Sequence, residues 1–342
     1  MRNRRGPHKL STVAELEAAG VKIVKWDGRY ATRSPASLSP TILHRCPLVI
    51  VDKDQRIVGV FVGKPADPQW DSEVIPGACR AMERASREAK ATDARASAPH
   101  RRGKFTAISS GVSFGGGQKV PGNLVHPKWR QRLIARLLKN KYIRRIAGFQ
   151  SSAFAYWAPK VYKEYADTLQ QLFTEYPGLE HNFRNSIFPA VTFNCSPDSV
   201  SLSHVDFNNN PAGWCAITSG GRFDHTSGAH LHMSPFKVAV EFPSGSTSLI
   251  LSGAIEHGNT PILDGETRFS MTQYAAGGLF RWVKYGFKSA KALLAMKGGK
   301  QIRAAYDGEA GSRWEQALNL FSTLDGIDCD RQNVFSQASV KA

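Results

Sequence analysis

The chain has 342 residues, of which 42% are hydrophobic and 10% aromatic, so it can bury a substantial core. Its 45 Lys and Arg against 28 Asp and Glu give a net charge of +17, which favours nucleic acid as a partner, ahead of an anionic membrane. No apolar run approaches the roughly 20 residues of a membrane span, and the basic start lacks the apolar stretch of a secretory signal. We therefore expect a soluble intracellular protein; a generally basic protein that touches no nucleic acid is the alternative.

The cysteines are odd in number, scattered, and never arranged as a CxxC pair. This argues against a zinc site or a redox motif and predicts reduced thiols. The five are Cys46, Cys79, Cys195, Cys215 and Cys329.

The first hundred residues divide into two predicted parts. Residues 1–40 are expected to form a basic, partly flexible N-terminal arm with one short helical pattern, VAELEAAGV. Residues 41–104 are expected to be accessory to the core, with a hairpin at CPLVIVDKDQRIVGVFVGKP and a basic helix from Glu73 to about Ala91. The basic side chains at the start, which could serve nuclear import or simply form a solvated end, are Arg2, Arg4 and Arg5.

Two segments before the middle of the chain carry glycine or positive charge. The stretch SSGVSFGGGQKVPGN matches neither GxGxxG nor the P-loop, so we expect a loop that closes over a ligand, or a flexible linker. The helical stretch HPKWRQRLIARLLKNKYIRRI has a basic face that can contact phosphates or stand in solvent.

After Asn185 the chain consists of short β-rich runs separated by turn residues, which predicts a sandwich or barrel. The runs are IFPAVTFN, SVSLSHVDF, WCAIT, HLHM, FKVAVEFP, STSLILSG, ETRFSMTQY and LFRWV. Beyond them, residues 291–342 are predicted to form a helical segment and a mobile tail.

A His-X-Asp pair lies in one of these runs. In a strand, residues two apart face the same side, so His204 and Asp206 could reach one metal ion. Two imidazoles and one carboxylate with open positions are the ligand set of non-haem Fe(II) oxygenases. A buried His bonded to an Asp is the structural alternative.

The third ligand has four candidates in this region: His225, His230, His232 and His257. The choice depends on the cosubstrate. If the enzyme uses 2-oxoglutarate, the distal carboxylate of that dianion needs a cation, and Arg binds carboxylates with two parallel hydrogen bonds. Arg268, eleven residues after His257, would return beside it on the next strand, which favours His257.

The strand that carries Arg268 alternates in polarity. Its polar residues are expected to line a cavity, whereas Phe269 and Met271 face the other way; an edge strand with its polar side in water is the alternative. The polar set is Arg268, Ser270, Thr272 and Tyr274.

Several long motifs in this order resemble the fungal branch of the TET/J-binding-protein family. They include SFGGGQ, NSIFPAVTFN, SHVDFNNNPAGWCAIT, EFPSGSTSLILSGAIEHGNTPI and GETRFSMTQYAAGGLFRWV, and the resemblance covers about residues 105–290. It implies an α+β fold in which this dioxygenase core is a double-stranded β-helix, or jelly roll, flanked by helices.

The resemblance also implies roles for particular residues. His204, Asp206 and His257 match the iron ligands, and Arg268 with Ser270 matches the 2-oxoglutarate site. The target base, flipped out of the duplex, would stack on an aromatic ring and meet amide side chains at its edge. The candidates for these base contacts are Tyr274, Asn208 and Asn209.

The implied activity is a dioxygenase that uses Fe(II), 2-oxoglutarate and O2 to oxidise the methyl group of 5-methylcytosine in DNA to hydroxymethyl, formyl and carboxyl forms, with N6-methyladenine demethylation as a further reaction. We expect a nuclear monomer that binds double-stranded DNA with methylated bases and no membrane. The alternatives are an RNA or N-methyl-base demethylase of the same chemistry, and an inactive DNA-binding relative.

Overall fold

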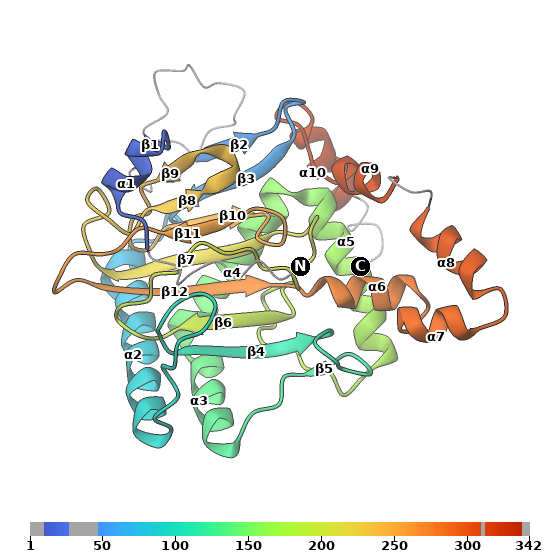
Figure 1. The fold of residues 1–342 in the computed structure, drawn as a ribbon, viewed down its shortest axis with the longest axis horizontal. Coiled ribbons are helices and arrows are strands. Elements are labelled where there is room, and N and C mark those ends of the chain that lie inside the picture. The colour runs from blue at the N-terminus through green and yellow to red at the C-terminus, as the bar shows by residue number, and fades with distance from the viewer. Residues whose placement is uncertain (1–9, 27–46, 309–311, 337–342) are drawn as a thin grey trace.

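Two β-sheets and a layer of helices make up the computed structural model, which describes residues 10–26, 47–308 and 312–336 (Figure 1). Eight strands form the large sheet, in the order β2-β3-β10-β7-β12-β6-β4-β5, and four form the small sheet, in the order β1-β9-β8-β11. The large sheet contains β2 (Leu48–Val51), β3 (Ile57–Gly63), β4 (Ala107–Ser113), β5 (Gly122–Asn123), β6 (Ala190–Asn194), β7 (Cys215–Arg222), β10 (Thr247–Ile250) and β12 (Thr267–Tyr274). The small sheet contains β1 (Lys22–Val24), β8 (Leu231–Met233), β9 (Val238–Val240) and β11 (His257–Asn259).

From β6 onward the chain alternates between the sheets. It leaves β6 of the large sheet, passes through the segment 199–206 beside β11, and returns to β7. It then forms β8 and β9 in the small sheet, β10 in the large sheet, β11 in the small sheet and β12 in the large sheet. Neighbouring strands pair antiparallel, except that β1 pairs parallel with β9. The alternation places side chains from both sheets around one interior.

Aromatic side chains join the two sheets. Phe61 of β3 contacts Trp26 and Phe242 edge to face, with ring centroids 5.4 and 5.8 Å apart. All three are almost completely buried, in the same core as Met233 and Leu249. Offset and edge-to-face pairs of this kind add to the stabilisation from apolar burial.

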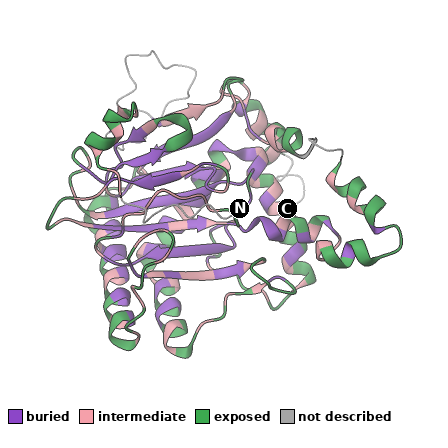
Figure 2. Ribbon diagram, viewed as in Figure 1, coloured by how far each residue is buried: buried purple, intermediate pink, exposed green. Residues whose placement is uncertain are grey.

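The other face of the large sheet is covered by helices. Phe193 of β6 and Phe269 and Met271 of β12 belong to a second core with α2, α3 and α4, so both faces of the sheet are largely buried (Figure 2). The helices are α1 (Val13–Ala18), α2 (Ile75–Thr92), α3 (Lys128–Lys139), α4 (Lys141–Trp157), α5 (Pro159–Glu175), α6 (Gly277–Lys284), α7 (Ala290–Ala295), α8 (Gly299–Asp307), α9 (Ser312–Asn319) and α10 (Ile327–Phe335), with a π-helical turn at Trp70–Val74 and a 3-10 turn at Ser234–Phe236. None of the described helices is long and apolar enough to cross a membrane.

The prediction of an α+β protein is confirmed by the mixture of helices and large antiparallel sheets. The predicted hairpin is β2 and β3, which extend the large sheet beside β10. The predicted strand LFRWV is wrong. It lies in α6, because Leu279 and Trp282, three positions apart, are buried on one helical face.

The ends of the chain differ in part from expectation. The pattern VAELEAAGV does begin a helix, α1, and β1 joins the small sheet. Arg2, Arg4 and Arg5 lie outside the described residues. The helix α10 was not predicted; Ile327 is buried and Arg331 donates to the main-chain oxygen of Tyr156. The division into residues 1–40, 41–104, 105–290 and 291–342 stays a prediction.

The role of Phe61 in joining the sheets can be tested by truncation. We expect Phe61→Ala to lower the free energy of unfolding by about 3–5 kcal/mol, because the substitution leaves a cavity between the sheets. Phe236→Ala is the control, since Phe236 is 37% exposed. Urea unfolding followed by circular dichroism measures both, and equal small losses would contradict the assignment.

Candidate metal centre

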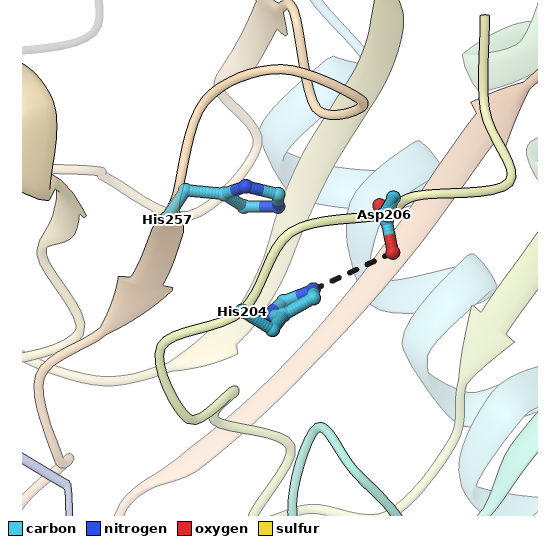
Figure 3. A group of neighbouring side chains, drawn as sticks. All are labelled: His204, Asp206 and His257. Carbon is cyan, nitrogen blue, oxygen red and sulfur yellow. Dashed lines mark ion pairs between the residues drawn. The ribbon is translucent and has the colours of Figure 1, made fainter. Parts of the chain in front are cut away.

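His204, Asp206 and His257 bring their ligand atoms together between the two sheets (Figure 3). One ligand atom from each residue lies within 4.8 Å of the others, and His204 Nε2 is 3.7 Å from Asp206 Oδ1. His257 is 4% exposed, and the side chains of His204 and Asp206 are 8% and 16% exposed. The three residues predicted as ligands are therefore adjacent, and the group could hold a metal ion.

Each histidine has one ring nitrogen occupied by the main chain. Nδ1 of His204 is 2.7 Å from the carbonyl oxygen of Leu202, and Nδ1 of His257 is 2.9 Å from that of Ile255. A carbonyl only accepts, so each Nδ1 carries the proton and donates. The lone pair of each Nε2 is left free, as metal ligation requires.

Burial favours the neutral form of both imidazoles. It lowers the pKa of His204 to about 4, with His257 adding to the effect. The pKa of His257 is also lowered, mainly by burial. Burial alone would raise the pKa of Asp206, but His257, His204 and Arg101 together lower it. Two neutral imidazoles and a carboxylate are thus present over a wide pH range.

The local structure around His204 and Asp206 is not the regular strand that was predicted. The run SVSLSHVDF forms isolated bridges only, since other hydrogen bonds replace the ladder. The main chains of His204 and His257 exchange hydrogen bonds of 2.9 and 3.0 Å, and the Asp206 amide donates to Ser252. The two side chains therefore converge because both residues are tied to segments near β10 and β11, and not because they alternate along a strand.

An arginine outside the predicted site contacts the carboxylate. Nη2 of Arg101 donates to Asp206 Oδ1 at 2.6 Å, and Nη1 donates to the main-chain oxygen of Val205, also at 2.6 Å. The Arg101 side chain is 49% exposed, so screening by solvent keeps the energy of this ion pair small. Its clear effect is to orient the carboxylate.

The cavity at the centre is lined by polar residues from both sheets. The predicted polar wall is found in part: Arg268, Ser270 and Thr272 of β12 line the cavity, whereas Tyr274, its fourth predicted member, is not among the lining residues. Phe269 and Met271 pack against the helices, as predicted. The full lining is Arg102, Asn194, Ser201, His204, Asp206, Ile217, Leu231, His257, Gly258, Asn259, Arg268, Ser270 and Thr272.

Arg268 is buried without a carboxylate partner in the described parts of the chain. It is 2% exposed, Nη1 donates to the Ser199 oxygen at 2.6 Å, and Nε has no partner. Burial lowers its pKa to about 10, which still leaves it charged at neutral pH. A buried unpaired charge is costly, so this cation fits an anion that enters the cavity.

Several lining residues were not predicted as site residues, among them Arg102, Asn194, Ser201 and Asn259. Arg102 is half-buried and lies close to the charge of Asp206. Asn194 donates to Ser270 Oγ at 2.8 Å and leaves its Oδ1 buried without a partner. Asn194 ends the motif NSIFPAVTFN, but no spacing in the sequence shows that β6 and the segment before β4 reach the cavity, because the fold alone brings them there.

The residues predicted to contact a base lie outside the cavity lining. The hydroxyl of Tyr274 is 3.2 Å from Thr192 Oγ1, at the end of β12. Asn208 is exposed, and Asn209 donates its side-chain amide to Ser252 Oγ at 2.9 Å. Asn208 is thus the freer of the two amides, and the role of all three stays a prediction.

The other histidines of this region stay apart from the group. His230 is fully buried, and its Nδ1 is 3.2 Å from Thr260 Oγ1. His232, on β8, faces Gly258 of β11. His225 lies in the loop between β7 and β8. The preference for His257 agrees with this geometry.

The basic stretch predicted as one helix is divided at Asn140 into α3 and the start of α4, because the Asn140 side chain caps α4. Both helices pack with α2 on the far side of the large sheet. Two other basic residues, Arg101 and Arg102, lie beside the cavity.

Metal binding should resist moderate acid, because protonation of the imidazoles competes with the metal and their pKa values are lowered. Two ordinary histidines with pKa near 6.5 would weaken binding roughly 70-fold between pH 7 and 5.5. We expect a rise in the Co(II) dissociation constant below about tenfold, measured by titration with circular dichroism as a check on folding. A 70-fold rise would contradict the burial argument.

No protein-family model matches the chain. No curated protein matches it. Among solved structures, NgTET1 in complex with 5mC DNA is 14% identical, with a TM-score of 0.46, over 75% of this chain and 83% of that one. A 2OG-Fe(II) oxygenase family oxidoreductase from Burkholderia pseudomallei is 15% identical, with a TM-score of 0.27, over 52% of this chain and 71% of that one. The viral collagen prolyl hydroxylase vCPH from Paramecium Bursaria Chlorella virus-1, a 2OG complex, is 13% identical, with a TM-score of 0.20, over 25% and 55%. At these scores the function rests on the residues of the site.

Proposed function

We propose that the protein is an Fe(II)- and 2-oxoglutarate-dependent dioxygenase that oxidises the methyl group of 5-methylcytosine in DNA. The observation that carries the proposal is one cavity with a metal-binding group of His204, Asp206 and His257 and a buried arginine, Arg268, that lacks a carboxylate partner in the described residues. Open metal positions beside an anion site are what a chelating keto acid requires.

The proposed architecture is a double-stranded β-helix, with the site between its two sheets. Its support is the alternation of β6 to β12 between the large and small sheets. Closing such a jelly roll brings β11 and the segment 199–206 opposite β12. The metal-binding group and Arg268 then belong to facing walls.

The residues present fit both the metal and the cosubstrate. His204, Asp206 and His257 would hold Fe(II), which supplies the oxidising chemistry with O2 when bound. Arg268 and Ser270 would bind the distal carboxylate of 2-oxoglutarate, and the unpartnered Nε of Arg268 is a donor available to it. Arg102, also in the cavity, offers a second cation for the dianion.

The substrate side of the proposal rests on charge and on the cavity entrance. A net charge of +17 and the arginines at positions 101 and 102 suit the phosphates of double-stranded DNA. Tyr274, Asn208 and Asn209 would contact the flipped base. Repeated oxidation would give hydroxymethyl, formyl and carboxyl products. On N6-methyladenine the methyl group would first be hydroxylated and would then leave as formaldehyde. We place the protein in the nucleus as a monomer.

Two other functions use the same residues differently. An RNA or N-methyl-base demethylase would share the cavity, since its substrate is also a polyanion with a methylated base. An inactive DNA-binding relative would have no use for intact ligands, and the complete His204, Asp206 and His257 group with free Nε2 atoms favours an enzyme.

The enzyme proposal predicts nucleoside products that depend on the metal ligands. Wild-type protein should convert 5-methylcytosine in a duplex to hydroxymethylcytosine and release succinate, and His204→Ala combined with Asp206→Ala should abolish both. His225→Ala is the control and should retain activity. Mass spectrometry of nucleosides, with N6-methyladenine duplexes and methylated RNA in parallel, measures the result. Turnover that survives the double substitution would refute the proposal.

Arg268 should govern the affinity for 2-oxoglutarate. Lys keeps the charge but loses the two-pronged geometry of the guanidinium, so Arg268→Lys should raise the half-saturating 2-oxoglutarate concentration by about tenfold or more. Arg222→Lys is the matched control, because Arg222 is exposed on the neighbouring strand β7. Succinate release at varied 2-oxoglutarate measures both, and equal half-saturation would count against the assigned role.

A further inference from the structure

Phe207 displays an aromatic ring beside the metal-binding group. It follows Asp206 directly and is 75% exposed, far more than an ordinary core phenylalanine. Single exposed apolar side chains are common on protein surfaces and need no function. Phe207 differs from other exposed apolar side chains in its position, because its neighbours in the chain, Asp206 and Asn208, both belong to the proposed site.

The loop that carries Phe207 is held on both sides. The main-chain amide of Asp206 donates to Ser252 at 2.9 Å, and the Asn208 oxygen accepts from Gly277 at 2.9 Å. Asn209 donates to the Asp206 oxygen at 2.8 Å. The exposed ring therefore stands on a loop fixed to the end of β10 and to the start of α6.

Arg101 covers part of the ring. Its Cζ is 5.5 Å from the ring centroid of Phe207, while its two terminal nitrogens donate to Asp206 and Val205. Guanidinium groups at this distance from an aromatic face are attracted by the ring. The pair thus presents a fixed cation next to an aromatic surface that remains open to solvent.

We propose that Phe207 and Arg101 form a stacking surface for a nucleobase next to the one that enters the cavity. This inference rests on the proposed function. Every base has a π-face, and base stacking on aromatic side chains, with arginine adding a cation–π contribution, is a sequence-tolerant way to hold nucleic acid. Arg101, half exposed, can also meet a neighbouring phosphate.

Substitutions at Phe207 test whether binding needs an aromatic ring or only an apolar side chain. Phe207→Ala and Phe207→Leu should each weaken duplex binding by about tenfold, whereas Phe207→Trp should restore it to within about twofold of wild type. Trp314→Ala is the control, since Trp314 is a 56% exposed aromatic on α9. Fluorescence anisotropy with a labelled 5-methylcytosine duplex measures the dissociation constants of the full-length protein with Fe(II) and without 2-oxoglutarate.

The outcomes distinguish this inference from the function on which it rests. Co(II) affinity and melting temperature should stay at wild-type values in all three variants, and a loss of either would assign Phe207 to the structure of the centre. If the wild-type protein oxidises the duplex but Phe207→Ala or Phe207→Leu binds the duplex as tightly as the wild type, the stacking surface is wrong and the proposed function stands. A wild-type protein that neither binds nor oxidises methylated duplexes would overturn both proposals.

Discussion

The main-chain pairing of His204 with His257 is the interaction on which the candidate site depends. The main-chain amide of His204 donates to the oxygen of His257 at 2.9 Å, and the amide of His257 donates to the oxygen of His204 at 3.0 Å. The centroids of the two imidazole rings are 4.5 Å apart. The segment 199–206 forms no regular ladder, and separate main-chain hydrogen bonds from Ser199 to Arg268 and from Asn259 to Ser201 hold the rest of it. Main-chain pairing therefore brings the ligand atoms of the two histidines together.

Burial gives the converged groups their chemical character. Desolvation keeps the imidazoles neutral and would neutralise a carboxylate, yet Asp206 stays ionised beside Arg101 and the histidines. The same desolvation leaves Arg268 charged but without a carboxylate among the described residues. A cavity with a carboxylate at one wall and a cation at the other is asymmetric in charge, which suits a ligand that has a metal-binding end and an anionic end.

The surface around the cavity extends this asymmetry outward. Arg101 contacts both Asp206 and the ring of Phe207, so one side chain links the metal-binding group to the exposed rim. The most basic helix, α3, faces away from this rim, behind the large sheet. The charge of the whole protein is therefore a poor guide to where a polyanion would meet it, and the few cations at the entrance matter more.

The sequence by itself determined the polar and apolar alternation of β12, the hairpin of β2 and β3, and a set of ligand candidates, because period-two patterns and local spacing report directly on strands. Only the tertiary structure decided that the run at 199–207 is not a regular strand, that LFRWV is helical, and that Asn194 and Arg102 reach the cavity. These features arise from pairing between distant segments. A short apolar run is compatible with either a helix or a strand. A local sequence pattern also does not show which distant residues will pack beside it.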